Sequence, residues 1–177
     1  MAVVRAYLLS NLIARRGELA GEFQARFPHS WLVWEKGVWK PSPRPSKSTV
    51  TRAAPRARSD LGPASGGPAP GGPAGDPLCY ELCERAPFKI GRAADCDVRL
   101  NEETVSRDHL WLEPAPDGAW MVRPGSPTSI TYIGGQALRG DGFALSARET
   151  LELGNVVLTF ETAETLLRRV DGLRGQS

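Results

Sequence analysis

Residues 91–114 read GRAADCDVRLNEETVSRDHLWLEP and contain two short polar segments, one with Arg92 and the other ending in His109. The serine, aspartate and histidine of the second segment suggest a catalytic triad. In an extended chain, however, Asp108 and His109 point to opposite faces, whereas a triad needs the acid to hold the base opposite the Ser106 nucleophile. A G-x-S-x-G nucleophile turn is also missing nearby. We therefore do not expect an enzyme.

Arg92, Ser106 and Arg107 are instead residue types that bind a phosphate group. A phosphate offers three strong acceptor oxygens and up to two negative charges. Loops on a rigid scaffold can bring a guanidinium, a hydroxyl and backbone N–H groups to such a group. Each charge-assisted hydrogen bond contributes about 1.5–3 kcal/mol. Three or four of them are enough for binding near a micromolar dissociation constant, about −8 kcal/mol.

The chain around this stretch is rich in strand signals. Residues 78–162 consist of short alternating or apolar runs separated by Gly, Pro, Asp and Asn. Closely spaced runs with little helix predict an all-β fold, a two-sheet β-sandwich. A short C-terminal helix and tail are expected over residues 163–177. The expected strands are PLCYELC, PFKIG, CDVRL, HLWLE, AWMVRP, SITYIGG, FALS, ETLELG and VVLTFET.

Residues 1–40 predict an amphipathic helix followed by a Trp-rich hairpin. Apolar residues recur at three- and four-residue steps over 3–27, and Gly17 and Gly21 leave two shorter helices open as an alternative. The stretch WLVWEKGVW, residues 31–39, predicts two short strands around a Lys-Gly turn. We expect its three tryptophans to pack against the helix or the later domain. A surface that docks a partner is the alternative.

Residues 41–77 predict a disordered basic linker. This stretch holds nine prolines, six glycines and no aromatic residue, so it lacks the apolar surface that ordering requires. Thr49 and Thr51 lie among basic residues and are possible phosphorylation sites. Once phosphorylated, either could occupy a phosphate site on its own chain. We do not expect nucleic-acid binding, because the linker offers no stacking residues.

The bulk composition sets further limits. A chain of 177 residues is long enough for two small domains at most. Its net charge of +2 creates no overall electrostatic field that would attract nucleic acid or a membrane. Cys79, Cys83 and Cys96 leave an odd thiol and show no zinc-site spacing, so we expect reduced thiols, no metal and no cofactor. Metal binding by Cys79 and Cys83 is a second choice. Without a membrane span or a signal peptide, a cytoplasmic location is expected.

Several short motifs in this region have, in combination, the spacing of one known protein family. The stretch FKIGRAADCDVRLNEETVSRDHLWLEP, residues 88–114, resembles the forkhead-associated (FHA) domain, with its Gly-Arg, Asp-(Val/Ile)-x-Leu and Ser-Arg-x-His pattern. The resemblance extends over residues 78–162. It implies a β-sandwich that binds phosphothreonine in partner proteins. The expected function is therefore a non-enzymatic binding module in Ser/Thr kinase signalling, with a phosphothreonine-containing protein, the kinase or its substrates as partners.

The resemblance also implies roles for individual residues. Arg92 and Ser106 match the residues that hold the phosphate and the ligand backbone, and Arg107 lies in the same loop with a supporting contact. Gly91 matches the glycine that lets the first loop turn tightly. His109 matches a histidine that bridges loops without touching the ligand.

A later segment departs from the family pattern. In PTSITYIGGQAL, residues 127–138, Ser129 stands where the family usually has the Asn that holds the peptide backbone, and Ile130 replaces a Gly. We expect Thr128 and Ser129 to contact the peptide and Gly135 to support the turn. Each lost hydrogen bond costs about 1 kcal/mol, so affinity could fall tenfold or more. An alternative hypothesis is a phosphate-independent scaffold that recruits partners through its N-terminal segment.

Overall fold

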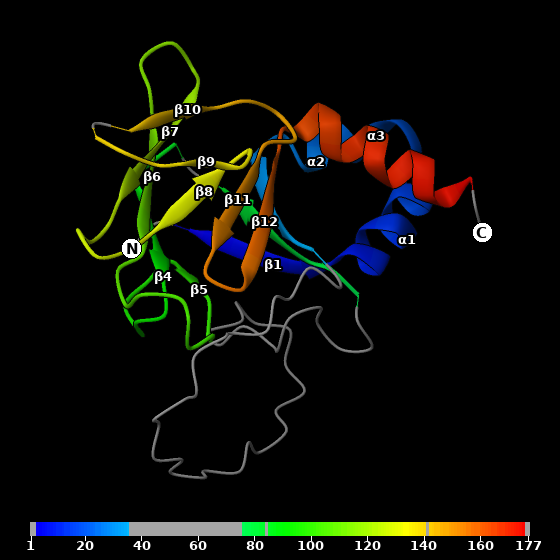
Figure 1. Ribbon diagram of the computed structural model, residues 1–177. Coiled ribbons are helices and arrows are strands. Elements are labelled where there is room, and N and C mark those ends of the chain that lie inside the picture. Colours follow the sequence, from blue (N-terminus) through cyan, green and yellow to red (C-terminus); the bar gives the residue numbers. More distant parts are fainter. Residues whose placement is uncertain (1–2, 36–75, 84, 141, 176–177) are drawn as a thin grey trace, which may run out of the picture.

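The computed structural model describes residues 3–35, 76–83, 85–140 and 142–175. In the described residues two β-sheets pack face to face, and helices cover part of the outer face of the larger sheet (Figure 1). The larger sheet runs in the order β1 (Val4–Leu8), β3 (Leu78–Leu82), β2 (Ser30–Trp34), β12 (Val156–Glu161), β11 (Thr150–Leu153), β8 (Thr131–Ile133) and β9 (Gln136–Ala137). The smaller runs in the order β10 (Phe143–Leu145), β7 (Trp120–Pro124), β6 (Leu110–Pro114), β4 (Phe88–Gly91) and β5 (Val98–Arg99).

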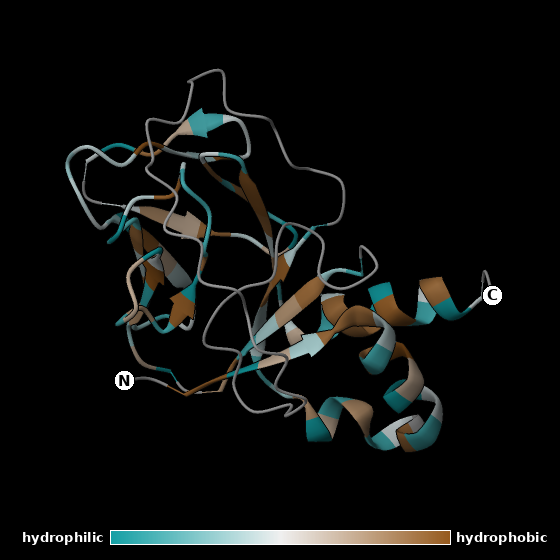
Figure 2. Cartoon of the chain, turned by 90° about the horizontal axis from the view of Figure 1, so that it is seen from below, coloured by the Kyte–Doolittle hydropathy of each residue, from teal (hydrophilic) through white to brown (hydrophobic). Residues whose placement is uncertain are grey.

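The all-β prediction is confirmed, and each of the nine expected runs contains a strand. Neighbouring strands are antiparallel except for β4 and β5, which are parallel. Alternation along the strands divides the apolar side chains between two cores. Leu32 and Trp34 of β2 face the smaller sheet, whereas Trp31 and Val33 face the helices. In Figure 2 central strands are largely brown, while the helices alternate between brown and teal.

The predicted N-terminal helix starts later than the sequence indicated. Residues 4–8 form β1, and the helical part follows as α1 (Leu9–Leu19), the 3-10 turn η1 (Ala20–Glu22) and α2 (Phe23–Arg26). All five residues of β1 pair with β3, so tertiary pairing overrides the helical periodicity there. The 3-10 turn includes Gly21 and separates the helices, as the alternative of two shorter helices anticipated.

The described part of the Trp-rich segment is a strand of the sandwich, and residues 36–39, the second arm of the predicted hairpin, lie outside the described residues. Trp31–Trp34 lies in β2, which pairs with β3 on one side and β12 on the other. The side chains of Trp31 and Trp34 are 0% and 2% exposed. The expected packing of Trp31 and Trp34 against the helices and the sandwich is therefore confirmed. The alternative, that these two tryptophans form a surface for docking a partner, is wrong. Trp39 lies outside the described residues.

The C-terminal helix α3 (Ala163–Arg174) closes the helical layer. Thr162 caps its N-terminus, and its hydroxyl accepts a hydrogen bond from the Thr165 N–H. Leu166 and Val170 are fully buried in the core shared with α1 and α2. Arg169 adds a bidentate ion pair with Glu35, with both N···O distances at 2.7 Å. Across the described ranges, no helix has the length and apolar character needed to cross a membrane.

The predicted linker, residues 41–77, lies almost entirely outside the described residues, and so do Thr49 and Thr51. Its two flanking strands are nevertheless direct neighbours, because Trp34 of β2 pairs with Leu78 of β3. The N-terminal segment thus supplies one edge strand and one interior strand of the larger sheet. Strands β1 and β2 of the segment predicted to precede the β-sandwich therefore contribute side chains to its core.

This arrangement predicts that residues 78–177 do not fold on their own. Without β2, strands β3 and β12 lose their shared neighbour, and the core facing Leu32 and Trp34 is left open. We expect the fragment to lack a cooperative thermal transition by circular dichroism. Adding a peptide of residues 3–35 should restore one.

A matched control replaces residues 36–75 of the full chain with a short Gly/Ser loop. Because Trp34 and Leu78 are already paired, this variant should still fold, and its free energy of unfolding should rise by about 0.6 kcal/mol for each halving of the loop length. A fragment 78–177 as stable as this variant would contradict the account of β2.

Candidate functional site

The two polar segments of the motif form loops that are joined along their backbones. The first loop, residues 92–97, connects β4 to β5, and the second loop, residues 100–109, connects β5 to β6. Arg92 donates its N–H to the Ser106 carbonyl at 2.9 Å, and Ala93 donates to the Arg107 carbonyl at 3.1 Å. The structure therefore brings Arg92, Ser106 and Arg107 together.

Two glycines allow the chain to pass close to the second loop. A Cβ on Gly91 would lie 2.1 Å from the Arg107 carbonyl oxygen, a distance that no side chain can take. On the other side, a Cβ on Gly125 would lie 2.8 Å from the Asp108 carbonyl oxygen. Position 91 therefore requires glycine because any side chain there would clash with the backbone of the second loop. Gly125 was missed, although its position directly after the strand residue Pro124 is a turn signal.

His109 connects the second loop to the third loop, residues 125–130, which leads from β7 to β8. Its side chain is buried, with 2% of the residue exposed. Ring atom Nδ1 lies 3.0 Å from the Ser106 backbone nitrogen, and Nε2 lies 3.3 Å from the Ile130 carbonyl oxygen. The His109 backbone carbonyl also accepts from the Gly125 N–H at 2.9 Å. One residue therefore joins both loops through side chain and backbone.

These contacts fix the tautomer of His109. The Ser106 N–H can only donate, so Nδ1 accepts and carries no proton. The Ile130 carbonyl can only accept, so Nε2 carries the proton. Burial lowers the pKa of His109 below its usual value, and the hydrogen bond to Ile130 opposes this only in part. The imidazole is therefore a neutral structural bridge.

The same contacts do not assemble the triad considered from the sequence. Both ring nitrogens of His109 face backbone groups, and a carboxylate oxygen of Asp108 lies 2.7 Å from the Lys89 ammonium. Asp108 is thus paired with a lysine instead of orienting the imidazole. In the described residues, Ser106, Asp108 and His109 have structural contacts that differ from those of a proton relay.

The two arginines remain at the surface of the loops. Arg92 is exposed, and its Nε donates to the Val105 carbonyl at 3.2 Å, which holds the guanidinium beside the second loop. Arg107 is exposed as well. Two nearby carboxylates, those of Asp95 and Asp108, are each 2.7 Å from the Lys89 ammonium, and these hydrogen bonds raise the pKa of Lys89. The positive charges of the arginines are therefore not neutralised by these two acids.

The third loop uses its hydroxyl groups mainly within the protein. The Ser129 hydroxyl lies 2.8 Å from the carbonyl oxygens of both His109 and Ser126, and its single hydrogen is shared between them. Thr128 is exposed, and its hydroxyl lies 3.0 Å from that of Ser126. Ser129 can therefore offer a ligand an acceptor but no free donor.

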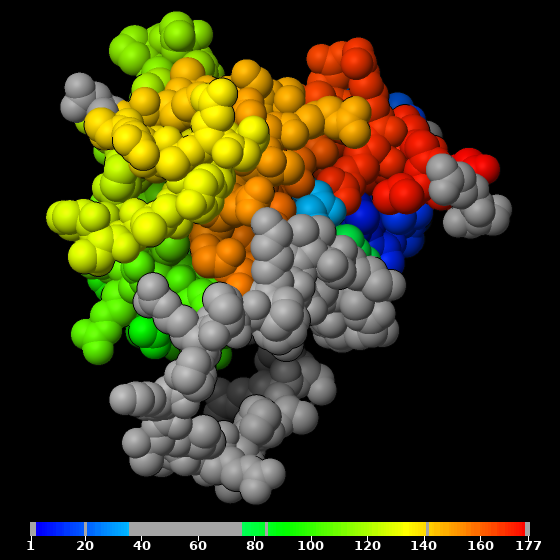
Figure 3. Space-filling model, in the orientation of Figure 1, coloured from blue at the N-terminus to red at the C-terminus, as the bar shows by residue number. Residues whose placement is uncertain are grey.

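Gly135 forms part of a turn next to this loop. Gly134 and Gly135 have φ angles of +54° and +83° and connect β8 to β9, as the central residues of a tight hairpin turn do. A Cβ on Gly135 would have nothing within 4 Å, so only its backbone angle favours glycine. Figure 3 shows this part of the chain, in yellow, at the surface.

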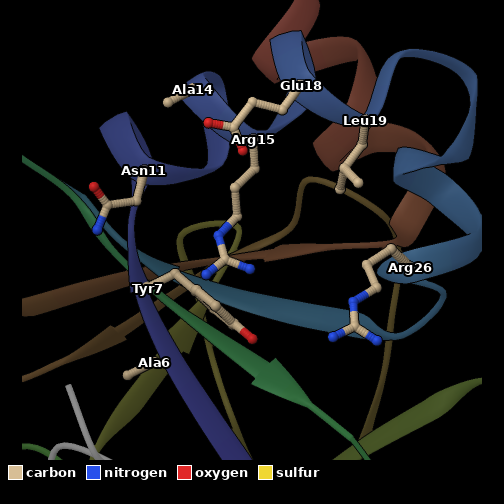
Figure 4. Close-up of a pocket in the computed structure, with 8 residues that line it drawn as sticks. All are labelled: Ala6, Tyr7, Asn11, Ala14, Arg15, Glu18, Leu19 and Arg26. Atoms are coloured by element: carbon tan, nitrogen blue, oxygen red, sulfur yellow. The ribbon is translucent and has the colours of Figure 1, made fainter.

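A pocket of about 480 Å³ lies elsewhere, between β1 and the helices (Figure 4). The Arg15 guanidinium lies over the Tyr7 ring, 5.5 Å from its centroid. Arg26 extends toward the same space from α2. None of the site residues predicted from the sequence lines this pocket, which has Ala6, Tyr7, Asn11, Ala14, Arg15, Glu18, Leu19 and Arg26 around it.

Comparison with known proteins gives a family for this part of the chain. Residues 88–154 match the family model described as the FHA domain. A segment of 85 residues, 48% of this chain, is 34% identical to the ABC transporter ATP-binding/permease protein Rv1747 of Mycobacterium tuberculosis. The match spans only 9% of that transporter.

Two solved structures illustrate the structural neighbours. The FHA domain of the CT664 protein from Chlamydia trachomatis is 12% identical, with a TM-score of 0.47, and the alignment covers 75% of this chain and 96% of that one. The N-terminal FHA domain of Rad53p from S. cerevisiae, solved with a phosphothreonine peptide, is 20% identical, with a TM-score of 0.40 and coverages of 47% and 73%. The family match over the motif-bearing residues identifies the domain: this chain contains an FHA domain, whose matched segment is residues 88–154.

Proposed function

We propose that this chain is a phosphothreonine-dependent protein-binding module. The observation that carries the proposal is the pairing of the first and second loops, which joins the Arg92 backbone to Ser106 and holds the Arg92 guanidinium at the Val105 carbonyl. The membership of residues 88–154 in the FHA family supports it, because the family resemblance implies phosphothreonine recognition by residues at these positions.

The geometry supports a role for Ser106 and the arginines as phosphate ligands. The bonds that hold the second loop use the backbone N–H and carbonyl of Ser106, which leaves its hydroxyl out of the scaffold. Arg92 and Arg107 supply two exposed cations on adjacent loops. The contact of the Arg92 guanidinium with the Val105 carbonyl reduces the side-chain freedom that this residue loses when it binds a dianion.

The third loop supports a weaker contact with the peptide backbone. Thr128 is exposed, whereas the Ser129 hydroxyl hydrogen is committed to the carbonyl groups of His109 and Ser126. We propose that the phosphate supplies most of the affinity and that this loop adds little. A Ser/Thr kinase or its substrates as partners, in the cytoplasm, fit this function.

Removal of the Arg92 guanidinium should weaken phosphopeptide binding. Titration of a degenerate phosphothreonine peptide library by fluorescence anisotropy should give a dissociation constant about tenfold to a hundredfold higher for Arg92→Ala, the cost of one charge-assisted hydrogen bond. Ser106→Ala should raise it about tenfold. The same library with unphosphorylated threonine should not bind at matching concentrations.

Arg168→Ala is the control for net charge. Arg168 lies on α3, its side chain is 75% exposed, and it forms an ion pair with Glu164 one helical turn away. This variant removes one positive charge and should bind the phosphopeptide as the parent chain does. Equal losses in Arg92→Ala and Arg168→Ala would show attraction by overall charge, and would refute the proposed site.

The neutral state of His109 predicts that acid destabilises the loops. The folded pKa of His109 is lowered below the ordinary value of about 6.5, so its contribution to stability is present above that pH and is lost as the pH falls through the folded pKa. Protonated Nδ1 would also face the Ser106 N–H, donor against donor. The thermal unfolding midpoint should therefore drop between about pH 7 and pH 5.

His109→Gln separates this effect from other titrating groups. Glutamine cannot gain a charge, so the variant should be less stable at neutral pH but lose less stability on acidification. Every other ionisable group is the same in both chains, so the difference between their pH curves reports on position 109. Parallel pH curves for the two chains would contradict the assignment of neutral His109 as the bridge.

A further inference from the structure

We propose that His29, Glu81 and Cys83 form a binding site for a divalent metal ion of the zinc class. One ligand atom from each, the imidazole nitrogen, a carboxylate oxygen and the thiol sulfur, all lie within 4.8 Å of one another. The site lies on the larger sheet, among residues that the phosphate-binding loops do not use. It does not depend on the proposed phosphothreonine function.

Strand register brings the three residues together from distant parts of the sequence. Ser30 of β2 pairs with Leu82 of β3, so His29 and Cys83 follow as the next residues of these antiparallel strands. Glu81 and Cys83 are two residues apart and point to the same face of the sheet. This is the face that Cys79 presents to the helical core.

The strongest evidence is the state of the Glu81 carboxylate. Its side chain is 0% exposed, and only one oxygen is satisfied, at 2.8 Å from Nδ1 of His29. The other oxygen, Oε2, has no hydrogen-bond partner in the part of the chain that the structure describes. A buried carboxylate oxygen without a partner is strongly destabilising when the group is ionised. A cation at this oxygen would remove that cost.

Arg5 is the cation that faces the unsatisfied oxygen. Arg5 of β1 pairs with Glu81 of β3 in the strand register. Its guanidinium nevertheless lies 3.9 Å from Oε2 of Glu81, beyond hydrogen-bond distance. The Arg5 side chain is 56% exposed, so it can move away from the carboxylate. We infer that a bound metal ion takes the counter-ion position that Arg5 fills incompletely.

The donor set indicates which metal fits. Imidazole, thiolate and carboxylate together are ligands of Zn²⁺, whereas Ca²⁺ and Mg²⁺ prefer oxygen alone. The His29 side chain is 34% exposed and Cys83 is half-buried, so an ion can enter from solvent, and a water can complete a tetrahedron. Zinc–ligand distances of about 2.0–2.3 Å require the three groups to move closer together, with His29 as the mobile one. Coordination releases the Cys83 thiol proton to the solvent.

A second trio, Asp95, Cys96 and Asp108, has similar spacing but is a poorer candidate. The Lys89 ammonium lies 2.7 Å from both of its carboxylates and fills the cation position. This difference supplies an internal control, because each trio contains one cysteine.

The test is a titration of the metal-free full chain with Zn²⁺ by isothermal calorimetry, and with Co²⁺ by absorption spectroscopy. We expect one Zn²⁺ per chain. Co²⁺ should give a thiolate charge-transfer band in the near ultraviolet, together with the intense visible bands of a four-coordinate site. Cys83→Ser should abolish the charge-transfer band, and Cys96→Ser should leave it unchanged. His29→Gln should weaken Zn²⁺ binding by about 100-fold or more, beyond the 10–100-fold typical of residues that only support a ligand.

Two further variants keep the test independent of folding defects. Arg5→Gln removes the competing cation at an exposed position and should raise Zn²⁺ affinity several-fold. Arg92→Ala, in the phosphate loops, should leave Zn²⁺ affinity unchanged. The proposal is overturned if Zn²⁺ does not bind at micromolar concentration, if Cys83→Ser keeps the charge-transfer band, or if Arg5→Gln leaves affinity unchanged or weaker while the circular dichroism spectrum is retained.

Discussion

The buried imidazole of His109 is the contact on which the arrangement of the second and third loops depends. Its two ring nitrogens are used by backbone groups of Ser106 and Ile130, one as acceptor and one as donor. Gly91 and Gly125 allow the chain to approach the His109 backbone from both sides. Since loops of this size would otherwise sample many conformations, the bridge gives Arg92 and Ser106 a fixed separation.

The sandwich that carries these loops is completed by strands that come from far away in the sequence. β2 lies between β3 and β12, and its inward side chains share one core with residues of the smaller sheet. The first and second loops connect strands of the smaller sheet, whereas the trio of His29, Glu81 and Cys83 belongs to the larger sheet. The two proposed sites therefore lie on different sheets of the same fold.

Local pattern was sufficient for much of this structure. Alternating runs bounded by Gly, Pro, Asp and Asn predicted strands, and residue type together with the FHA resemblance placed Gly91, Arg92 and Ser106 on loops. The role of β1 and β2 could not be predicted, because it follows from pairing with strands that lie beyond the linker. The same holds for the trio of His29, Glu81 and Cys83, since strand register alone brings His29 beside Cys83. The inward hydrogen bonds of Ser129 depend on the path of the third loop, which no residue spacing specifies.

The central claim, that Arg92, Ser106 and Arg107 receive a phosphothreonine, is tested most directly by nuclear magnetic resonance. A titration of the ¹⁵N-labelled full chain with a phosphothreonine peptide should shift the amide signals of these residues and of their neighbours in the first and second loops. The unphosphorylated peptide should leave them in place. Shifts confined to β1 and the helices, or equal shifts with both peptides, would contradict the claim.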